Sequence, residues 1–148
     1  MTKLISTIIS WFELIPHSLH ALLARLAIAL VFWNSGRTKV PDWNFLSVNE
    51  NTLLLFTDEY KVPFIPPYPA AFMAQTAEHI FPILLVIGLG SRFSALALLG
   101  MTTVIELFVY PDAYVVHGTW AVILIFIIKY GPGAISLDHL LNKIKMPN

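Results

Sequence analysis

Four long apolar segments dominate the pattern of hydrophobic and polar positions along the chain. They cover residues 18–36, 70–89, 93–110 and 113–130. Each is close to the roughly 20 residues that an α-helix needs to cross a hydrocarbon core of about 30 Å. None shows the alternation of an extended β-strand. Because backbone polar groups in lipid must bond within their own segment, the pattern predicts four membrane-spanning helices, called spans below.

Shorter segments flank and connect the spans. In residues 1–16 the polar and apolar side chains lie on opposite sides of a helical wheel, which predicts a helix lying in the membrane interface. Residues 136–145 predict a second short helix on the cytoplasmic side, with Ser136 as its N-cap. A long loop, residues 37–69, joins the first two spans. Its middle, residues 49–60, can form a short helix before the prolines of "PFIPPYP" block helix formation.

Composition agrees with this interpretation. Hydrophobic residues make up 57% of the 148 residues and charged residues only 12%, whereas soluble domains carry about 25% charge. The predicted fold class is therefore all-α: an integral membrane four-helix bundle, with an N-terminal interfacial helix and a long first outer loop. The formal net charge is zero, so we expect no nucleic-acid partner. No cysteine is present, which excludes disulfides and thiolate-bound metal clusters built from this chain.

The distribution of lysine and arginine predicts the orientation in the bilayer. With four spans both termini share one side, and that side carries more cations. The positive-inside rule then places both termini in the cytoplasm and the long loop outside, in a bacterial inner (plasma) membrane. The cations on the terminal side are Lys3, Arg92, Lys129, Lys143 and Lys145, against Arg37, Lys39 and Lys61 on the other.

Two charged residues lie inside the spans. Arg25 falls in the first span, about 10 Å from its start, and Glu78 lies about 12 Å from the outer end of the second. A charge at the centre of a span costs about 2.5–3.5 kcal/mol, so we expect Arg25 to face a partner inside the bundle. Glu78 is the candidate partner, near mid-depth. The alternative is that Arg25 extends along the helix to the cytoplasmic interface.

Each span contributes a polar group to the outer half of the bundle, which predicts an outward-opening polar pocket. Glu78 and His79 point about 100° apart on a helix, so only one of them needs to line it. The alternative is a structural network, in which Glu78 pairs with Arg25 and Glu106 pairs with Arg37 or Lys39. The candidate catalytic residues are Glu78, His79, Arg25 and Lys39; the other pocket residues are Trp33, Asn34, Ser35, Arg37, Glu106 and His117.

A metal site is the less favoured use of these residues. The side chains of Glu78, His79, Glu106 and His117 are suitable ligands for copper or zinc. They are scattered along the chain, however, without an HxxxH or ExxH spacing. We therefore expect no stable metal site.

Three stretches of the chain resemble the DoxX family of small four-helix membrane proteins. They are "RLAIALVFWNSGRTKV", "AEHIFPILLVIGLGSRFSALALLGM" and "HGTWAVILIFIIKYGPGAISLDHLL", and the resemblance covers about residues 19 to 141 of a single domain over residues 1–148. The resemblance implies that family motif positions are occupied by Arg25, Ser35, Gly36, Lys39, Glu78, Arg92 and Asp138.

The resemblance leaves two functions open. Some family members are subunits of quinone-linked oxidoreductases, which implies a quinone in the pocket. Glu78 or His79 would exchange protons with its oxygens, Arg25 or Lys39 would stabilise negative charge, and a redox partner protein would supply electrons. Other members resemble this chain more closely and lie beside genes for copper-binding modified peptides. These imply a non-enzymatic membrane module that anchors, exports or helps mature such a peptide or its partner enzymes.

Small residues also favour close packing between helices, and a homodimer is one way to use them. A proton-coupled transporter has weaker support, because no inverted-repeat symmetry is evident between the two halves of the chain.

Overall fold

The computed structural model describes residues 2–60 and 62–145. Lys61 and the side chain of Lys145, both counted above in the charge distribution, lie outside this description. The described residues form α-helices and connecting turns without a β-strand, so the predicted all-α class is confirmed. The helices are α1 (Thr2–Glu13), α2 (His17–Arg37), α3 (Glu50–Asp58), α4 (Pro67–Ile87), α5 (Ser91–Phe108), α6 (Tyr114–Tyr130) and α7 (Leu137–Lys145).

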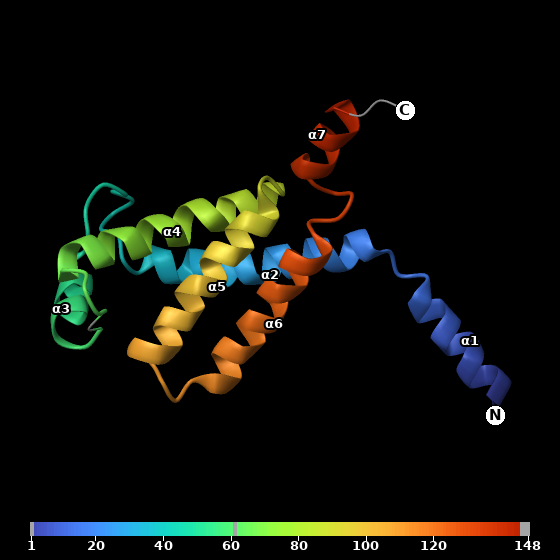
Figure 1. Cartoon of the computed structure of the whole chain (residues 1–148), viewed down its shortest axis with the longest axis horizontal. Helices are drawn as coiled ribbons and strands as arrows, with labels where there is room; N and C mark the ends of the chain where they lie inside the picture. The colour runs from blue at the N-terminus through green and yellow to red at the C-terminus, as the bar shows by residue number, and fades with distance from the viewer. Residues whose placement is uncertain (1, 61, 146–148) are drawn as a thin grey trace.

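Four of the helices pack in a ring. Helix α2 contacts α4 and α6, and α5 contacts the same two helices from the opposite side (Figure 1). The core between them is aliphatic and aromatic, with Ile28, Phe32, Leu85, Leu98 and Leu124 fully or almost fully buried. The outer surface is apolar as well: Leu30, Ile80, Leu96 and Val122 are all exposed. A bundle that is apolar inside and outside suits a lipid solvent.

Three described helices are long and apolar enough to cross a membrane, namely α2, α4 and α5. Helix α6 is apolar but has only 17 residues, slightly short of a full span. The chain is thus a helical membrane protein, with three helices of spanning length among the described residues and a shorter apolar helix, α6, packed beside them. The expected count of four full-length spans differs from the structure at this helix.

The second span begins earlier than expected. Helix α4 starts at Pro67 rather than at residue 70, and Pro66 serves as its N-cap. Proline is tolerated in the first turn of a helix because the N–H groups there have no intrahelical acceptor. The "PPYP" sequence therefore initiates the helix instead of blocking it.

Short turns and caps connect the helices at one end of the ring. Gly88 and Gly90 adopt left-handed conformations, with φ of 73° and 57°, in the turn between α4 and α5. The Asp138 carboxylate of α7 accepts hydrogen bonds from the backbone N–H groups of Gly90 (2.8 Å) and Ser91 (3.0 Å). Ser136 caps α7 as expected, since its Oγ accepts a hydrogen bond from His139 N.

The bundle has two distinct ends (Figure 1). At one, which we call the loop end, α3 lies against α4, and the loops that flank α3 connect it to α2 and to α4. At the other, the termini end, α1 extends away from the bundle and α7 follows the last turn of α6. The expected middle helix of the long loop is present as α3, whose N-cap Asn49 accepts a hydrogen bond from Asn51 N.

Candidate functional site at the loop end

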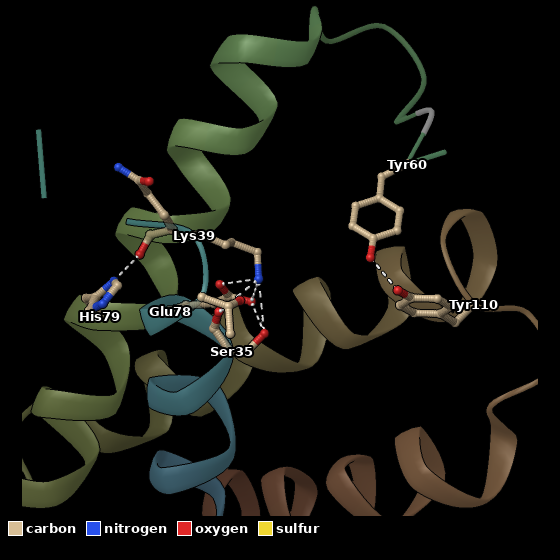
Figure 2. Close-up of polar contacts among 8 residues, drawn as sticks. Ser35, Lys39, Tyr60, Glu78, His79 and Tyr110 are labelled. Atoms are coloured by element: carbon tan, nitrogen blue, oxygen red, sulfur yellow. Dashed lines mark hydrogen bonds and ion pairs between the residues drawn. The ribbon is translucent and has the colours of Figure 1, made fainter. Parts of the chain in front are cut away.

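A three-residue polar cluster joins α2 to the middle of α4 (Figure 2). Lys39 Nζ lies 2.8 Å from Glu78 Oε2 and donates hydrogen bonds to Glu78 Oε1 and Ser35 Oγ, both at 3.0 Å. Ser35 Oγ donates to Glu78 Oε1, also at 3.0 Å. The side chain of Glu78 is 2% exposed and that of Lys39 is 14% exposed. A buried carboxylate is thus neutralised by one cation in its immediate surroundings.

Local sequence explains why these groups meet. Ser35 and Lys39 are four residues apart, and the chain keeps a helical turn beyond α2 because Lys39 N donates to Gly36 O at 2.9 Å. Their side chains therefore share one face. Gly36 lies between them at the contact with α4. A Cβ there would stand 2.8 Å from His79 Cε1 and 3.0 Å from Glu78 Cβ. Only a glycine allows this close approach of the two helices.

The cluster forms part of the wall of a cavity of about 630 Å³. The cavity lies between α2, α4, α5 and α6 and extends to the segment that follows α3. Its lining is largely apolar, with Val31, Phe32, Met101, Ile105 and Trp120 among the residues that form it. Its polar lining residues are Asn34, Ser35, Thr38, Lys39, Glu78, Tyr60 and Tyr110.

Tyr60 and Tyr110 form a second polar group on this cavity. Their hydroxyl groups are hydrogen-bonded to each other and their rings pack edge to face. Figure 2 shows the pair apart from the Lys39–Glu78 cluster, with Tyr60 on the segment after α3 and Tyr110 just beyond α5. Sequence reasoning missed both as pocket residues. Tyr110 ends the third predicted span and Tyr60 lies in the long loop, and neither position carries a sequence signal of a cavity wall.

His79 lies on a different face of α4 from Glu78. Its Nδ1 is 2.6 Å from the carbonyl oxygen of Gln75, and its ring packs edge to face between the rings of Trp33 and Phe45. Neither His79 nor Trp33 lines the cavity. Gln75, which sequence reasoning also missed, donates from Nε2 to the carbonyl oxygens of Phe45 and Ser47, at 3.2 Å each. This side of α4 therefore anchors the long loop.

Arg25 does not meet Glu78. Its Nη1 donates to the carbonyl oxygens of Leu85 (2.8 Å) and Val86 (3.2 Å), and its Nη2 donates to that of Ile135. The side chain is fully buried within the protein, and its three carbonyl acceptors lie at the termini end of the bundle. The last carbonyls of α4 have no partner within the helix and form the negative end of its dipole, which explains the attraction. The expected Arg25–Glu78 pair is therefore wrong.

Glu106 and His117 form a separate pair between α5 and α6. His117 Nδ1 lies 2.5 Å from Glu106 Oε2, and the His117 ring packs on that of Trp120. The expected pairing of Glu106 with Arg37 or Lys39 is wrong, because α5 packs against α4 and α6 rather than α2. The Arg37 guanidinium instead lies 3.6 Å from the centroid of the Trp43 ring. Neither Arg37, Glu106 nor His117 lines the cavity.

The structure thus divides the predicted pocket residues into several groups. Asn34, Ser35, Lys39 and Glu78 share the cavity, whereas Arg25 lies at the other end of the bundle. Within residues 2–60 and 62–145, no group of three His, Asp or Glu side chains is placed to hold a metal ion.

Comparison with known proteins identifies the family. The DoxX family model matches residues 20–111, more than half of the chain. An uncharacterized protein of Haemophilus influenzae is 32% identical over 133 residues, which cover 83% of this chain and 83% of that protein. No solved structure matches the chain. The matched residues include Ser35, Lys39 and Glu78, and the chain belongs to the DoxX family.

Proposed function

We propose that the protein is the membrane component of an oxidoreductase system and that its loop-end cavity binds a quinone. The observation that carries this proposal is the Lys39–Glu78 pair in the wall of a largely apolar cavity of about 630 Å³. A quinone headgroup is an apolar ring with two oxygens. The cavity offers apolar walls and two separate polar groups, at Lys39–Glu78 and at Tyr60–Tyr110, so the residues present fit such a ligand.

A bound quinone would supply the electron-transfer chemistry, and the chain's own residues would manage charge and protons. Glu78 can hold a proton at Oε2, which lies beside Lys39 Nζ but accepts no well-aligned hydrogen bond from any described residue. The Lys39 ammonium group would stabilise negative charge in the cavity. The apolar lining would exclude water and strengthen both effects. His79 faces away from the cavity, so Glu78 is the proposed proton carrier.

Electrons would come from a partner protein, because the chain contains no cysteine. We place the protein in the bacterial inner membrane with the termini end in the cytoplasm. Arg92, Lys129 and Lys143 lie at that end and are exposed, whereas Arg37 and Lys39 lie at the loop end. This asymmetry follows the positive-inside rule. The redox partner would then act on the cytoplasmic side or through the outer loop.

The test begins with the full-length protein purified in a mild detergent. Mass spectrometry of an organic extract should detect a co-purifying quinone, and a short-chain quinone should quench the fluorescence of Trp120 in the cavity wall. Ala97→Phe places a phenyl ring in the cavity from α5. Because the ring takes up space that the quinone needs, quinone binding should weaken about tenfold or more. Val122→Phe adds the same ring on the exposed surface and is the matched control.

Glu78→Gln tests the proton role separately. With a membrane reductase as donor, it should lower quinone turnover more than quinone binding. The absence of co-purified quinone, together with equal quenching in the Ala97→Phe and Val122→Phe variants, would reject the proposal. That result would favour the non-enzymatic membrane module instead.

A further inference from the structure

A second cavity lies at the termini end of the bundle, away from the site described above. Its volume is about 600 Å³, and residues from the start of α2, the start of α5, the end of α6 and the polar side of α7 line it. The residues that matter for its chemistry are His17, Arg92, Tyr130, Gly131, Asp138 and His139. Nothing in the proposed quinone chemistry uses this cavity.

One charged side chain in the termini-end cavity is available to bind an anion. Asp138 is its only acidic lining residue, and both of its carboxylate oxygens already accept hydrogen bonds from the Gly90 and Ser91 N–H groups. Arg92 is exposed and forms no ion pair with any residue of the described chain. The cavity therefore presents a cation without a counter-ion and an acid that is already satisfied.

The turn after α6 lies close to the Arg92 side chain. Gly131 has φ of 79° and is buried, and a Cβ on it would lie 3.2 Å from Arg92 Nη2 and 3.3 Å from Nε. The guanidinium group thus packs closely against a glycine backbone that a side chain would disturb. The planar guanidinium group is suited to phosphate, which it can bind through two parallel N–H groups.

The surroundings of the cavity suit a phosphate that is carried by a lipid. The cavity lies where the apolar helices of the ring end, and the exposed side chain of Phe93 continues its edge onto the lipid-facing surface. The amphipathic α1 and α7 lie at the same end (Figure 1). A phosphate bound here would be attached to apolar chains that follow this surface. The lining offers no carboxylate free of hydrogen bonds to pair with the ammonium group of a zwitterionic headgroup, so it favours an anionic one.

We propose that the termini-end cavity binds the headgroup phosphate of an anionic phospholipid, with Arg92 as its principal ligand. The site is independent of the quinone cavity, and the proposal stands whether or not a quinone binds. Bound lipid would join α2, α5, α6 and α7 at the membrane boundary.

Thermal unfolding of the full-length protein in a neutral detergent tests the proposal. Short-chain phosphatidylglycerol should raise the unfolding temperature more than short-chain phosphatidylcholine at equal concentration. Arg92→Gln should weaken the apparent affinity for phosphatidylglycerol about tenfold, as expected for losing a charge-assisted contact. Lys143→Gln removes an equal charge from an exposed position outside the cavity, so it should change that affinity less than twofold.

Three results would overturn the proposal. These are equal stabilisation by the two lipids, equal loss of affinity in the Arg92→Gln and Lys143→Gln variants, and full reproduction of the stabilisation by inorganic phosphate alone. The last would identify a free-anion site. A further measurement needs only the wild-type protein: the preference for phosphatidylglycerol should decrease as salt is added. A preference that does not change with salt would also reject an electrostatic headgroup site.

Discussion

The ammonium group of Lys39 lies 2.8 Å from the carboxylate of Glu78, and both side chains line the same largely apolar cavity. Lys39 follows the last turn of α2 and Glu78 lies in the middle of α4, so the pair bridges two helices that pack against each other. Separating two buried partners is costly, because each leaves an uncompensated charge. The contribution of this pair to stability can therefore be measured by removing its members singly and together.

Glu78→Gln should lower the free energy of unfolding by about 3 kcal/mol, and Lys39→Met by a similar amount. The double variant Lys39→Met/Glu78→Gln should lose clearly less than the sum of the two, because no unpaired charge remains. Unfolding with a denaturing detergent measures all three variants. Losses that simply add would show that the two groups do not stabilise each other.

Gly36→Ala should destabilise the protein by about 1–3 kcal/mol, because the added methyl group would overlap His79 and press on Glu78 at the contact of α2 with α4. Gly100→Ala is the matched control. Nothing lies within 4 Å of the Cβ position at Gly100, which is inside α5, so alanine there should be neutral or stabilise by about 0.5–1 kcal/mol. Equal thermal stability of the two variants would contradict the close approach at Gly36.

Arg25→Met should destabilise by about 3 kcal/mol or more, since it leaves the carbonyl groups of Leu85, Val86 and Ile135 without their charged donor. The segment after α6 should become more sensitive to protease, because Ile135 loses its attachment to α2. In detergent without added lipid, Arg92→Gln should change the free energy of unfolding little, because Arg92 is exposed. If this segment resists protease equally well in Arg25→Met and in the wild type, then Arg25 does not attach it to α2.

Tyr60 should titrate at unusually high pH. Burial, the hydrogen bond with Tyr110 and the nearby charges of Glu59 and Glu78 raise its pKa above the ordinary value of 10.0. Because the raised pKa favours the neutral phenol in the folded state, the stabilisation is complete below about pH 10 and is lost as the pH rises toward the folded-state pKa.

Ultraviolet absorbance of phenolate, compared between wild type and Tyr60→Phe, isolates this titration. Tyr110→Phe should shift it downward, whereas Tyr114→Phe, at an exposed position, should leave it unchanged. A titration of Tyr60 at pH 10 in the wild type would contradict the hydrogen bond between Tyr60 and Tyr110.

The sequence predicted the helices better than it predicted their contacts. Runs of apolar residues identify a helix in lipid, but spans such as α2 are apolar on their buried and exposed faces alike, so the pattern does not say which residues face inward. Ser136 as a cap and α3 in the long loop could be predicted because their signals are local. The start of α4 at Pro67 was missed because proline both blocks a helix interior and begins a helix.

The candidate site shows the same limit. Glu78 and Lys39 could be recognised as polar residues in the outer half of the bundle, yet the choice of Lys39 rather than Arg25 as the partner of Glu78 depends on depth and helix order. Arg25 is satisfied by Ile135, 110 residues away in sequence, and by backbone carbonyls, which leave no sequence signal. Tyr60 reaches the cavity only through the path of the loop after α3.

The attachment of Arg25 to Ile135 has a consequence for biogenesis. During translation the first membrane helix emerges with a charge whose acceptor has not yet been synthesised. The last carbonyls of α4 can offer only part of that acceptor, and Asp138, which caps the start of α5, emerges later still. The nascent protein therefore cannot reach its final packing helix by helix. It must close around the segment that follows α6, which is synthesised after all four helices of the ring.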